Sequence, residues 1–164
     1  MNEYIRDVVD RYRNRGILVD TNILLLLFVG ATNRDRIRQF SRTKQFAESD
    51  YDLLVALLNE FDKVITTPNI LTEVSNWIGY LKEPERQLCF SIFAQGISSL
   101  EENYVKSSVI CQASEFMGFG LTDCSIKEMA RGKYLVLSDD LKLVNNLHST
   151  GIDAINFNNL RNFS

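Results

Sequence analysis

Asp20 is a carboxylate that lies between two apolar segments, residues 17–19 and 23–29. A charged group in such surroundings is costly unless it is paired or bound to a metal ion. Asp139 and Asp140 follow another apolar segment, residues 134–137, with Ser138 in between. If both preceding segments are strands of one parallel sheet, the acids after them lie at the same edge, where functional groups of such sheets gather. We therefore expect these carboxylates to contribute to one site.

Two further acids, Glu73 and Asp123, are expected at the same edge. Glu73 lies about one and a half turns into the helix expected after residues 63–66, and Asp123 begins the helix before residues 134–137. Carboxylates directed into one cleft raise each other's pKa unless a cation lies between them. Oxygen ligands alone suit Mg²⁺ or Mn²⁺, and paired ions support in-line hydrolysis of phosphodiesters. The candidate metal ligands and catalytic residues are Asp20, Glu73, Asp123 and Asp140, with Asp139 as a further candidate ligand.

The elements that must position these acids are short strands alternating with helices. The strand candidates are residues 17–19, 63–66, 134–137 and 152–157, with a further short strand including residues 104–105. Short apolar runs of this kind are typical of parallel strands buried on both faces. The alternation predicts an α/β fold in which a short parallel sheet is flanked by helices on both faces. At 164 residues the chain fits one domain, residues 1–164.

Local signals indicate several helix boundaries. Thr67 is expected as an N-cap with Pro68 at the first helical position, a strong signal for a helix start. Another helix is expected after Pro84. Residues 118–120, Gly-Phe-Gly, interrupt a helical pattern that resumes just afterwards. Residues 31–48 are polar and predict helical pieces around a mobile connection.

Composition argues against several other classes of protein. Apolar residues make up 45% of the chain and charged residues 24%, which is a globular composition. The three cysteines are widely spaced and accompany a single histidine, so neither a zinc site nor a disulfide framework is expected. Because no apolar signal region is visible and the longest apolar run is far short of ~20 residues, we expect a cytoplasmic protein without a membrane partner. The net charge of −3 argues against a general electrostatic nucleic-acid binder, although it includes the carboxylates of a metal site.

The order and spacing of the acidic motifs resemble those of PIN-domain ribonucleases. The similar segments are Val19-Asp20-Thr21-Asn22, residues 67–74, Leu121-Thr122-Asp123 and Val136-Leu137-Ser138-Asp139-Asp140. The resemblance implies a Rossmann-like PIN domain with a Mg²⁺ or Mn²⁺ site that cleaves single-stranded RNA, often as the toxin of a toxin–antitoxin pair. It matches Asp20, Glu73, Asp123 and Asp140 to the acidic positions of the family. It also implies an antitoxin protein and a homodimer as partners. Ser138 or Asn22 is expected to hydrogen-bond a ligand carboxylate and fix its direction.

Simpler roles compete with this interpretation. Asp123 and Asp139 are also favoured as helix caps, and Glu73 also suits a solvated helix face. The basic run of residues 34–44 is either a solvated face or a grip on RNA phosphates. For the whole protein, the main alternative is a catalytically inactive PIN-like binding or regulatory module. A third hypothesis makes Asp20 a phosphate-accepting nucleophile, which is disfavoured because no second acid stands two residues later.

Overall fold

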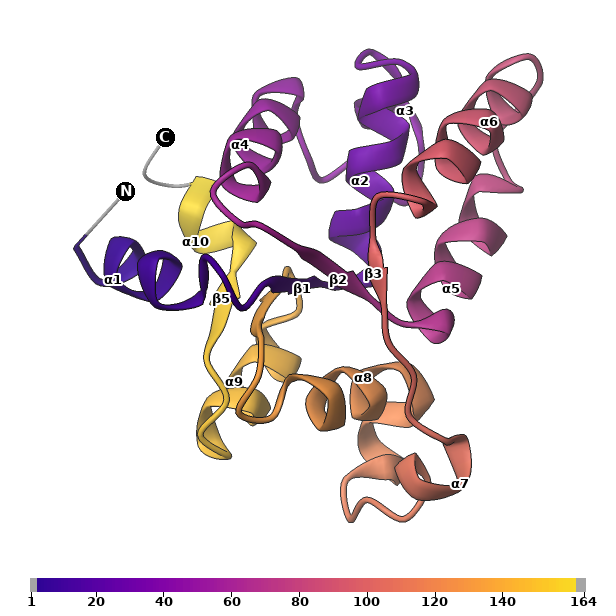
Figure 1. Ribbon diagram of the computed structural model, residues 1–164. Coiled ribbons are helices and arrows are strands. Elements are labelled where there is room, and N and C mark those ends of the chain that lie inside the picture. Colours follow the sequence, from indigo (N-terminus) through magenta and orange to yellow (C-terminus); the bar gives the residue numbers. More distant parts are fainter. Residues whose placement is uncertain (1–2, 162–164) are drawn as a thin grey trace.

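Short parallel strands run through the centre of the structure (Figure 1). The computed structural model describes residues 3–161, and within them the sheet has five strands in the order β3-β2-β1-β4-β5. The strands are β1 Ile17–Val19, β2 Val64–Thr66, β3 Glu101–Glu102, β4 Leu135–Ser138 and β5 Ala154–Asn156. Every neighbouring pair is parallel. The predicted α/β class is confirmed, and the arrangement is compatible with a Rossmann-like fold.

Helices cover both faces of this sheet. They are α1 Glu3–Tyr12, α2 Thr21–Thr32, α3 Arg36–Gln39, α4 Glu48–Leu58, α5 Pro68–Ile78, α6 Glu85–Ile97, α7 Ser107–Ile110, α8 Phe116–Ala130, α9 Leu141–Ser149 and α10 Phe157–Arg161. In Figure 1, α2, α4, α5 and α6 lie above the strands, and α7, α8 and α9 lie below them. Parallel strands need this cover, and every side chain of β1 is buried. No helix among residues 3–161 is long and apolar enough to cross a bilayer.

β1 lies in the middle of the sheet, at the place where the order of the strands reverses. From β1 the chain forms β2 and β3 on one side, and then returns to form β4 and β5 on the other. Val19 pairs with Leu137, so the carboxyl ends of β1 and β4 are adjacent. In open α/β sheets, ligands bind outside the carboxyl ends of the strands at such a reversal. The topology therefore favours a functional cleft between Asp20 and residues 138–140.

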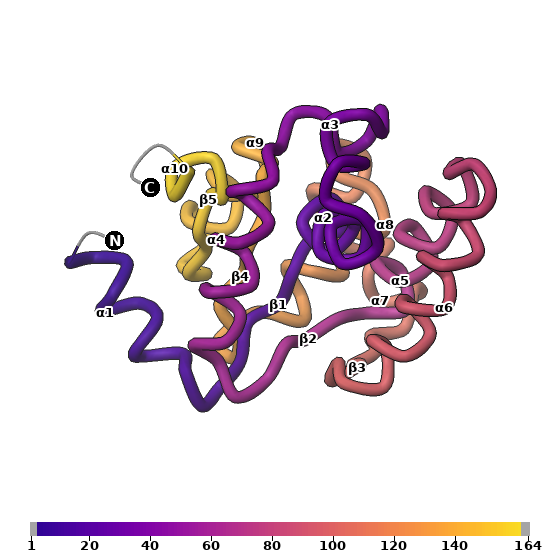
Figure 2. The backbone as a smooth tube through the Cα atoms, turned by 90° about the horizontal axis from the view of Figure 1, so that it is seen from above, coloured from indigo at the N-terminus to yellow at the C-terminus, as the bar shows by residue number. Residues whose placement is uncertain are grey.

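α2 is the central helix of the upper layer and is apolar on almost all sides. Figure 2 shows it between α4 and the pair formed by α5 and α6. Phe28 of α2 packs edge-on against Phe93 of α6, with the ring centroids 5.0 Å apart. Gly96 permits this approach, because a Cβ at that position would lie 2.5 Å from Phe28 Cε1. Packing along its length thus fixes α2, whose first turn follows Asp20 directly.

Two strand predictions differ from the structure. The short strand expected at residues 104–105 is wrong: the strand is Glu101–Glu102, and Tyr104 is 66% exposed. Two consecutive acids carry no strand pattern, but charged side chains suit a short strand at the edge of a sheet. The last strand is predicted at residues 152–157, whereas β5 spans Ala154–Asn156 and Phe157 begins α10.

The polar connection between α2 and α4 is tied to the core at several points. Of the helical pieces expected within residues 31–48, one is present, as α3. Ile37 is fully buried, and Phe40 and Phe46 are also part of the core. The hydroxyl of Thr43, itself buried, donates to the carbonyl oxygen of Ile37 at 2.8 Å. These apolar residues are irregularly spaced among polar ones, so no helical or strand period indicates them in the sequence.

The close packing at Gly96 gives a first prediction. Gly96→Val places methyl groups where the Phe28 ring lies, and overpacking of this kind costs about 1–3 kcal/mol of unfolding free energy. Gly118→Val is the matched control, because nothing lies within 4 Å of a Cβ at that helical position. Denaturant unfolding monitored by circular dichroism checks both variants. Equal destabilisation by the two substitutions would contradict the described contact between α2 and α6.

Candidate functional site

Asp20 lies at the carboxyl end of β1 and caps α2 with its side chain. Its Oδ1 accepts a hydrogen bond from the backbone N–H of Thr21 at 2.6 Å. Its Oδ2 accepts one from the hydroxyl of Ser138, at the end of β4, at 2.5 Å. The residue is only 7% exposed. Burial raises its pKa to about 6, although both hydrogen bonds lower it.

Glu73 reaches the same place from α5. This helix begins as predicted, with Pro68 at its start and the Thr67 hydroxyl accepting from a backbone N–H of the first turn. The Thr21 hydroxyl donates to Glu73 Oε2 at 2.8 Å, and the Thr122 hydroxyl donates to Glu73 Oε1 at 2.5 Å. Both carboxylate oxygens are therefore held, one from α2 and the other from α8. Glu73 is not the solvated helix-face residue of the simpler explanation.

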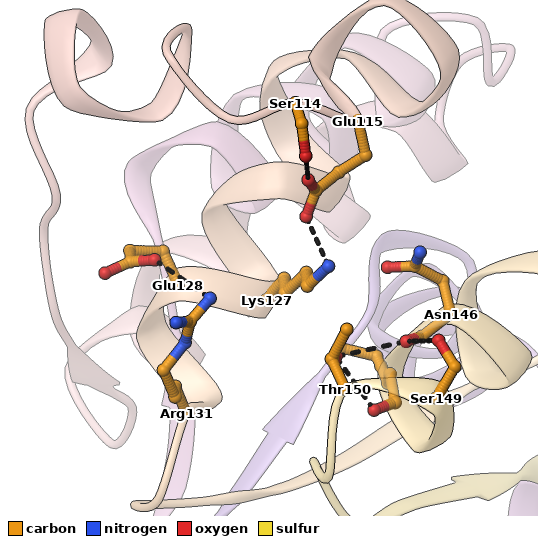
Figure 3. Close-up of polar contacts among 9 residues, drawn as sticks. Ser114, Glu115, Lys127, Glu128, Arg131, Asn146, Ser149 and Thr150 are labelled. Carbon is orange, nitrogen blue, oxygen red and sulfur yellow. Dashed lines mark hydrogen bonds and ion pairs between the residues drawn. The ribbon is translucent and has the colours of Figure 1, made fainter.

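Asp123 lies on α8, shortly after a kink at Gly120. Gly120 has φ 78° and ψ −172°, a conformation that side-chain-bearing residues rarely adopt, so the predicted interruption of this helix is present. Figure 3 shows Lys127 directed towards Glu115, which stands at the other end of the kinked segment, and the two form an ion pair. This pairing lowers the pKa of Glu115 to about 2. The ion pair holds both parts of α8 together and so fixes the position of Asp123.

The electrostatic surroundings of Asp123 show that the acids lie near one another. Burial is the largest cause that raises its pKa, and Asp20, Asp140 and Glu73 raise it further, to about 7. Lys142, at the start of α9, opposes this increase. Three acids from separate segments of the chain thus act on the charge of Asp123.

The end of β4 directs Asp139 and Asp140 differently. Asp140 caps α9, because its Oδ1 accepts from the backbone N–H groups of Lys142 at 2.7 Å and Leu143 at 3.2 Å. Asp139 instead accepts from the Asn22 side chain at 3.2 Å, and burial raises its pKa. The cap expected at Asp139 therefore lies at Asp140.

An open cleft of about 520 Å³ connects these groups, and its walls include Asp20, Glu73, Asp123 and Asp140. Asp139 is not part of its lining. Within residues 3–161, none of these four acids forms an ion pair with Lys, Arg or His. Negative charge is therefore collected in the cleft and held mainly by hydroxyl and amide donors.

The carboxylate oxygens of the cleft are the type of ligand that a hard divalent cation prefers. Carboxylate oxygens suit Mg²⁺ and Mn²⁺, and Mg²⁺ commonly keeps several waters while one or two carboxylates hold it. Among the described residues, however, no three Asp, Glu, His or Cys side chains stand close enough together to form a ready cage for one ion. Hydrogen bonds to Thr21, Thr122 and Ser138 occupy the carboxylates in this arrangement. Separate carboxylates joined through water suit such a cation better than a closed protein cage.

Several contributing residues are not among the predicted metal ligands and catalytic residues, although Arg42 belongs to the basic run that was considered as a grip on RNA phosphates. Thr21 and Thr122 orient Glu73, while Arg42, Trp77 and Tyr80 line the cleft. The sequence could have indicated the two threonines, since each is the immediate neighbour of a candidate aspartate. The expected roles of Ser138 and Asn22 as donors to candidate carboxylates are both present, on Asp20 and Asp139 respectively.

Comparisons with known proteins add no relative: no protein-family model matches the chain, and no curated protein sequence matches it. The geometry of the site and the sequence resemblance therefore carry the functional argument.

The raised carboxyl pKa values predict how the stability of the metal-free protein depends on pH. Unfolded aspartates titrate near 3.8, whereas Asp20 and Asp123 titrate at about 6 and about 7 in the folded chain. Between these values the folded state binds more protons than the unfolded state, so the free energy of unfolding falls as pH rises from about 4 to about 7. Urea unfolding in EDTA at about pH 5 and about pH 8 measures this loss.

The double variant Asp20→Asn, Asp123→Asn is the control for this slope, because amides do not titrate. Its unfolding free energy should change less over the same pH interval than that of the parent chain. An equal fall in both proteins would show that other groups cause the pH dependence.

Proposed function

We propose that this chain is a metal-dependent endoribonuclease of the PIN type that hydrolyses phosphodiester bonds of single-stranded RNA. The observation that carries the proposal is the meeting of Asp20, Glu73, Asp123 and Asp140 in one cleft at the strand reversal. Their order along the chain resembles that of PIN-domain ribonucleases. A soft-metal site is disfavoured because the walls of this cleft include no cysteine or histidine.

Each acid would contribute to holding Mg²⁺ or Mn²⁺, and Asp20 is oriented through both of its carboxylate oxygens. A divalent cation bound there supplies a water nucleophile and neutralises charge on the leaving oxygen. Hydrogen bonds from the Ser138 hydroxyl and the Thr21 N–H hold the Asp20 carboxylate in one orientation. Thr21 and Thr122 do the same for Glu73. Such supporting donors typically change metal affinity or activity by about 10–100-fold when they are removed.

Two parts of the family resemblance stay predictions for this chain. An antitoxin would be a protein that covers the acidic cleft, and a homodimer would bury a further apolar face. Neither changes the proposed chemistry, which depends on the cleft residues alone.

The second candidate function is a PIN-like binding or regulatory module without catalysis. The observation that favours this module is the spacing of the acids, since no three of them stand close enough to hold one ion among residues 3–161. The two candidates differ in a direct observable, since only the enzyme requires a cation in the cleft.

Cleavage and metal binding together test the proposal. The purified protein should cut single-stranded RNA in Mn²⁺ or Mg²⁺ and lose this activity in EDTA. Asp20→Asn should lower kcat/KM by about a hundredfold or more, because it removes a charged ligand of the cation. Asp62→Asn is the matched control, since Asp62 is exposed and lies outside the lining of the cleft.

Calorimetric titration of the same proteins with Mn²⁺ gives a readout that does not depend on turnover. The parent chain should bind Mn²⁺, and Asp20→Asn should bind it more weakly. Full activity in Asp20→Asn would refute the assignment of this residue. Absence of Mn²⁺ binding, together with no cleavage of RNA or DNA, would favour the binding module.

A further inference from the structure

A second groove, of about 820 Å³, opens beside the acidic cleft. Its lining includes Arg36, Arg42, Trp77, Tyr80 and Lys82. Arg42, Trp77 and Tyr80 also line the acidic cleft, so the two hollows share a wall. The groove lies between α3, with the residues after it, and the end of α5, which can be located in Figure 1. A chain that enters the cleft can therefore continue into this groove.

The shared wall is aromatic, and part of it is unusually exposed. Trp77 and Tyr80 have ring centroids 5.5 Å apart and an interplanar angle of 36°. Arg42 lies over the Trp77 ring, whereas Tyr80 is 73% exposed. A tyrosine this exposed contributes little to the core. Its ring instead offers a surface on which a flat apolar group can stack.

The same groove contains cations that no acid neutralises. Arg36 is paired with Glu85 at 2.5 Å. By contrast, neither Arg42 nor Lys82 forms an ion pair within the described part of the chain. These charges stand out in a chain whose net charge is −3. An anionic ligand is attracted to this groove, next to a cleft that repels anions until a cation is bound.

We propose that this aromatic and basic groove binds the single-stranded RNA that flanks the scissile phosphate, with a base stacked on Tyr80 and phosphates at Arg42 and Lys82. Aromatic platforms with nearby cations bind single strands without sequence readout, because every base has a face that can stack. In a duplex, stacking between neighbouring base pairs covers those faces. The proposal rests on the proposed nuclease function and supplies a reason for its preference for single strands.

Binding measured without cleavage separates this proposal from the enzymatic one. The probe is a fluorescein-labelled oligouridylate, titrated in EDTA with the full chain and followed by fluorescence anisotropy. Tyr80→Ala should raise Kd about tenfold or more, as loss of one stacked base does. Tyr104→Ala is the matched control, because Tyr104 is 66% exposed and lines neither hollow, and its Kd should stay within about twofold of the parent value.

The proposed phosphate contact of Lys82 is tested by the salt dependence of the same titration. Lys82→Gln should reduce the slope of log K against log salt by about 0.7, the value for one phosphate contact on a single strand. Lys133→Gln is the control, since Lys133 is exposed and outside both hollows, and its slope should equal that of the parent. A duplex of matching length should show no dependence on Tyr80.

The possible outcomes are distinct. Weaker binding by Tyr80→Ala alone among the tyrosine variants supports the groove, whether or not the protein cleaves RNA. Unchanged binding by Tyr80→Ala and Lys82→Gln overturns the groove proposal, even if metal-dependent cleavage is observed. Absence of any RNA binding by the parent chain also overturns it.

Discussion

The carboxylate of Asp20, buried where β1 meets β4, is the constraint around which the site is organised. Burial of a charge at the junction of two apolar strands is expensive, and protein interiors usually meet the cost with an opposite charge. Here the compensation comes from a hydroxyl of Ser138 and the first amide of α2. These neutral donors are insufficient, because the pKa of Asp20 is still raised to about 6. Within residues 3–161, the acids of the cleft therefore carry charge that no ion pair balances.

Hydroxyl groups beside the acids also fix the orientation of the carboxylates. Carboxylates that repel each other would turn apart unless something held them. Thr21 and Thr122 each hold one oxygen of Glu73, and Ser138 links Asp20 to the backbone of Asp140. Because hydroxyls orient a carboxylate without neutralising it, the cleft keeps its negative charge. Glu115, by contrast, is neutralised by a cation, because Lys127 forms an ion pair with it across the kink of α8.

Much of this fold can be predicted from the sequence because buried parallel strands have a strong local signal. β1 is an uninterrupted apolar run, β4 is one as far as Ser138, and acids follow both, so their shared edge follows from the topology of parallel sheets. β3 could not be predicted, since a two-residue edge strand of glutamates has neither an apolar run nor an alternating pattern. The helix start at Thr67 was clear for the opposite reason, because proline and a capping hydroxyl act locally.

The candidate site shows the same division between local and long-range information. Asp20, Asp139 and Asp140 could be named because they follow the apolar runs of β1 and β4. Glu73 and Asp123 lie within α5 and α8, and the resemblance to the family motifs indicated them. The orientation of Glu73 by two threonines could not be predicted, since its donors come from residues about 50 positions away on either side along the chain. The aromatic groove is harder still to predict. It exists only because residues 36–42 and 77–82 are brought together by the packing of α2 against α5.

α5 connects the acidic cleft to the aromatic groove in one rigid element. Glu73 and Trp77 are four residues apart and so lie on the same side of this helix, about 6 Å apart along its axis. Tyr80 follows in the turn that ends the helix, where its N–H donates to the carbonyl oxygen of Trp77 at 3.0 Å. The N-cap at Thr67 fixes where α5 starts, and the two hydroxyls on Glu73 fix its rotation. The spacing between Glu73 and Trp77 is therefore set by helix geometry, and Tyr80 follows in the turn directly after the helix. A ligand that spans both hollows meets a spacing established by the fold before it binds.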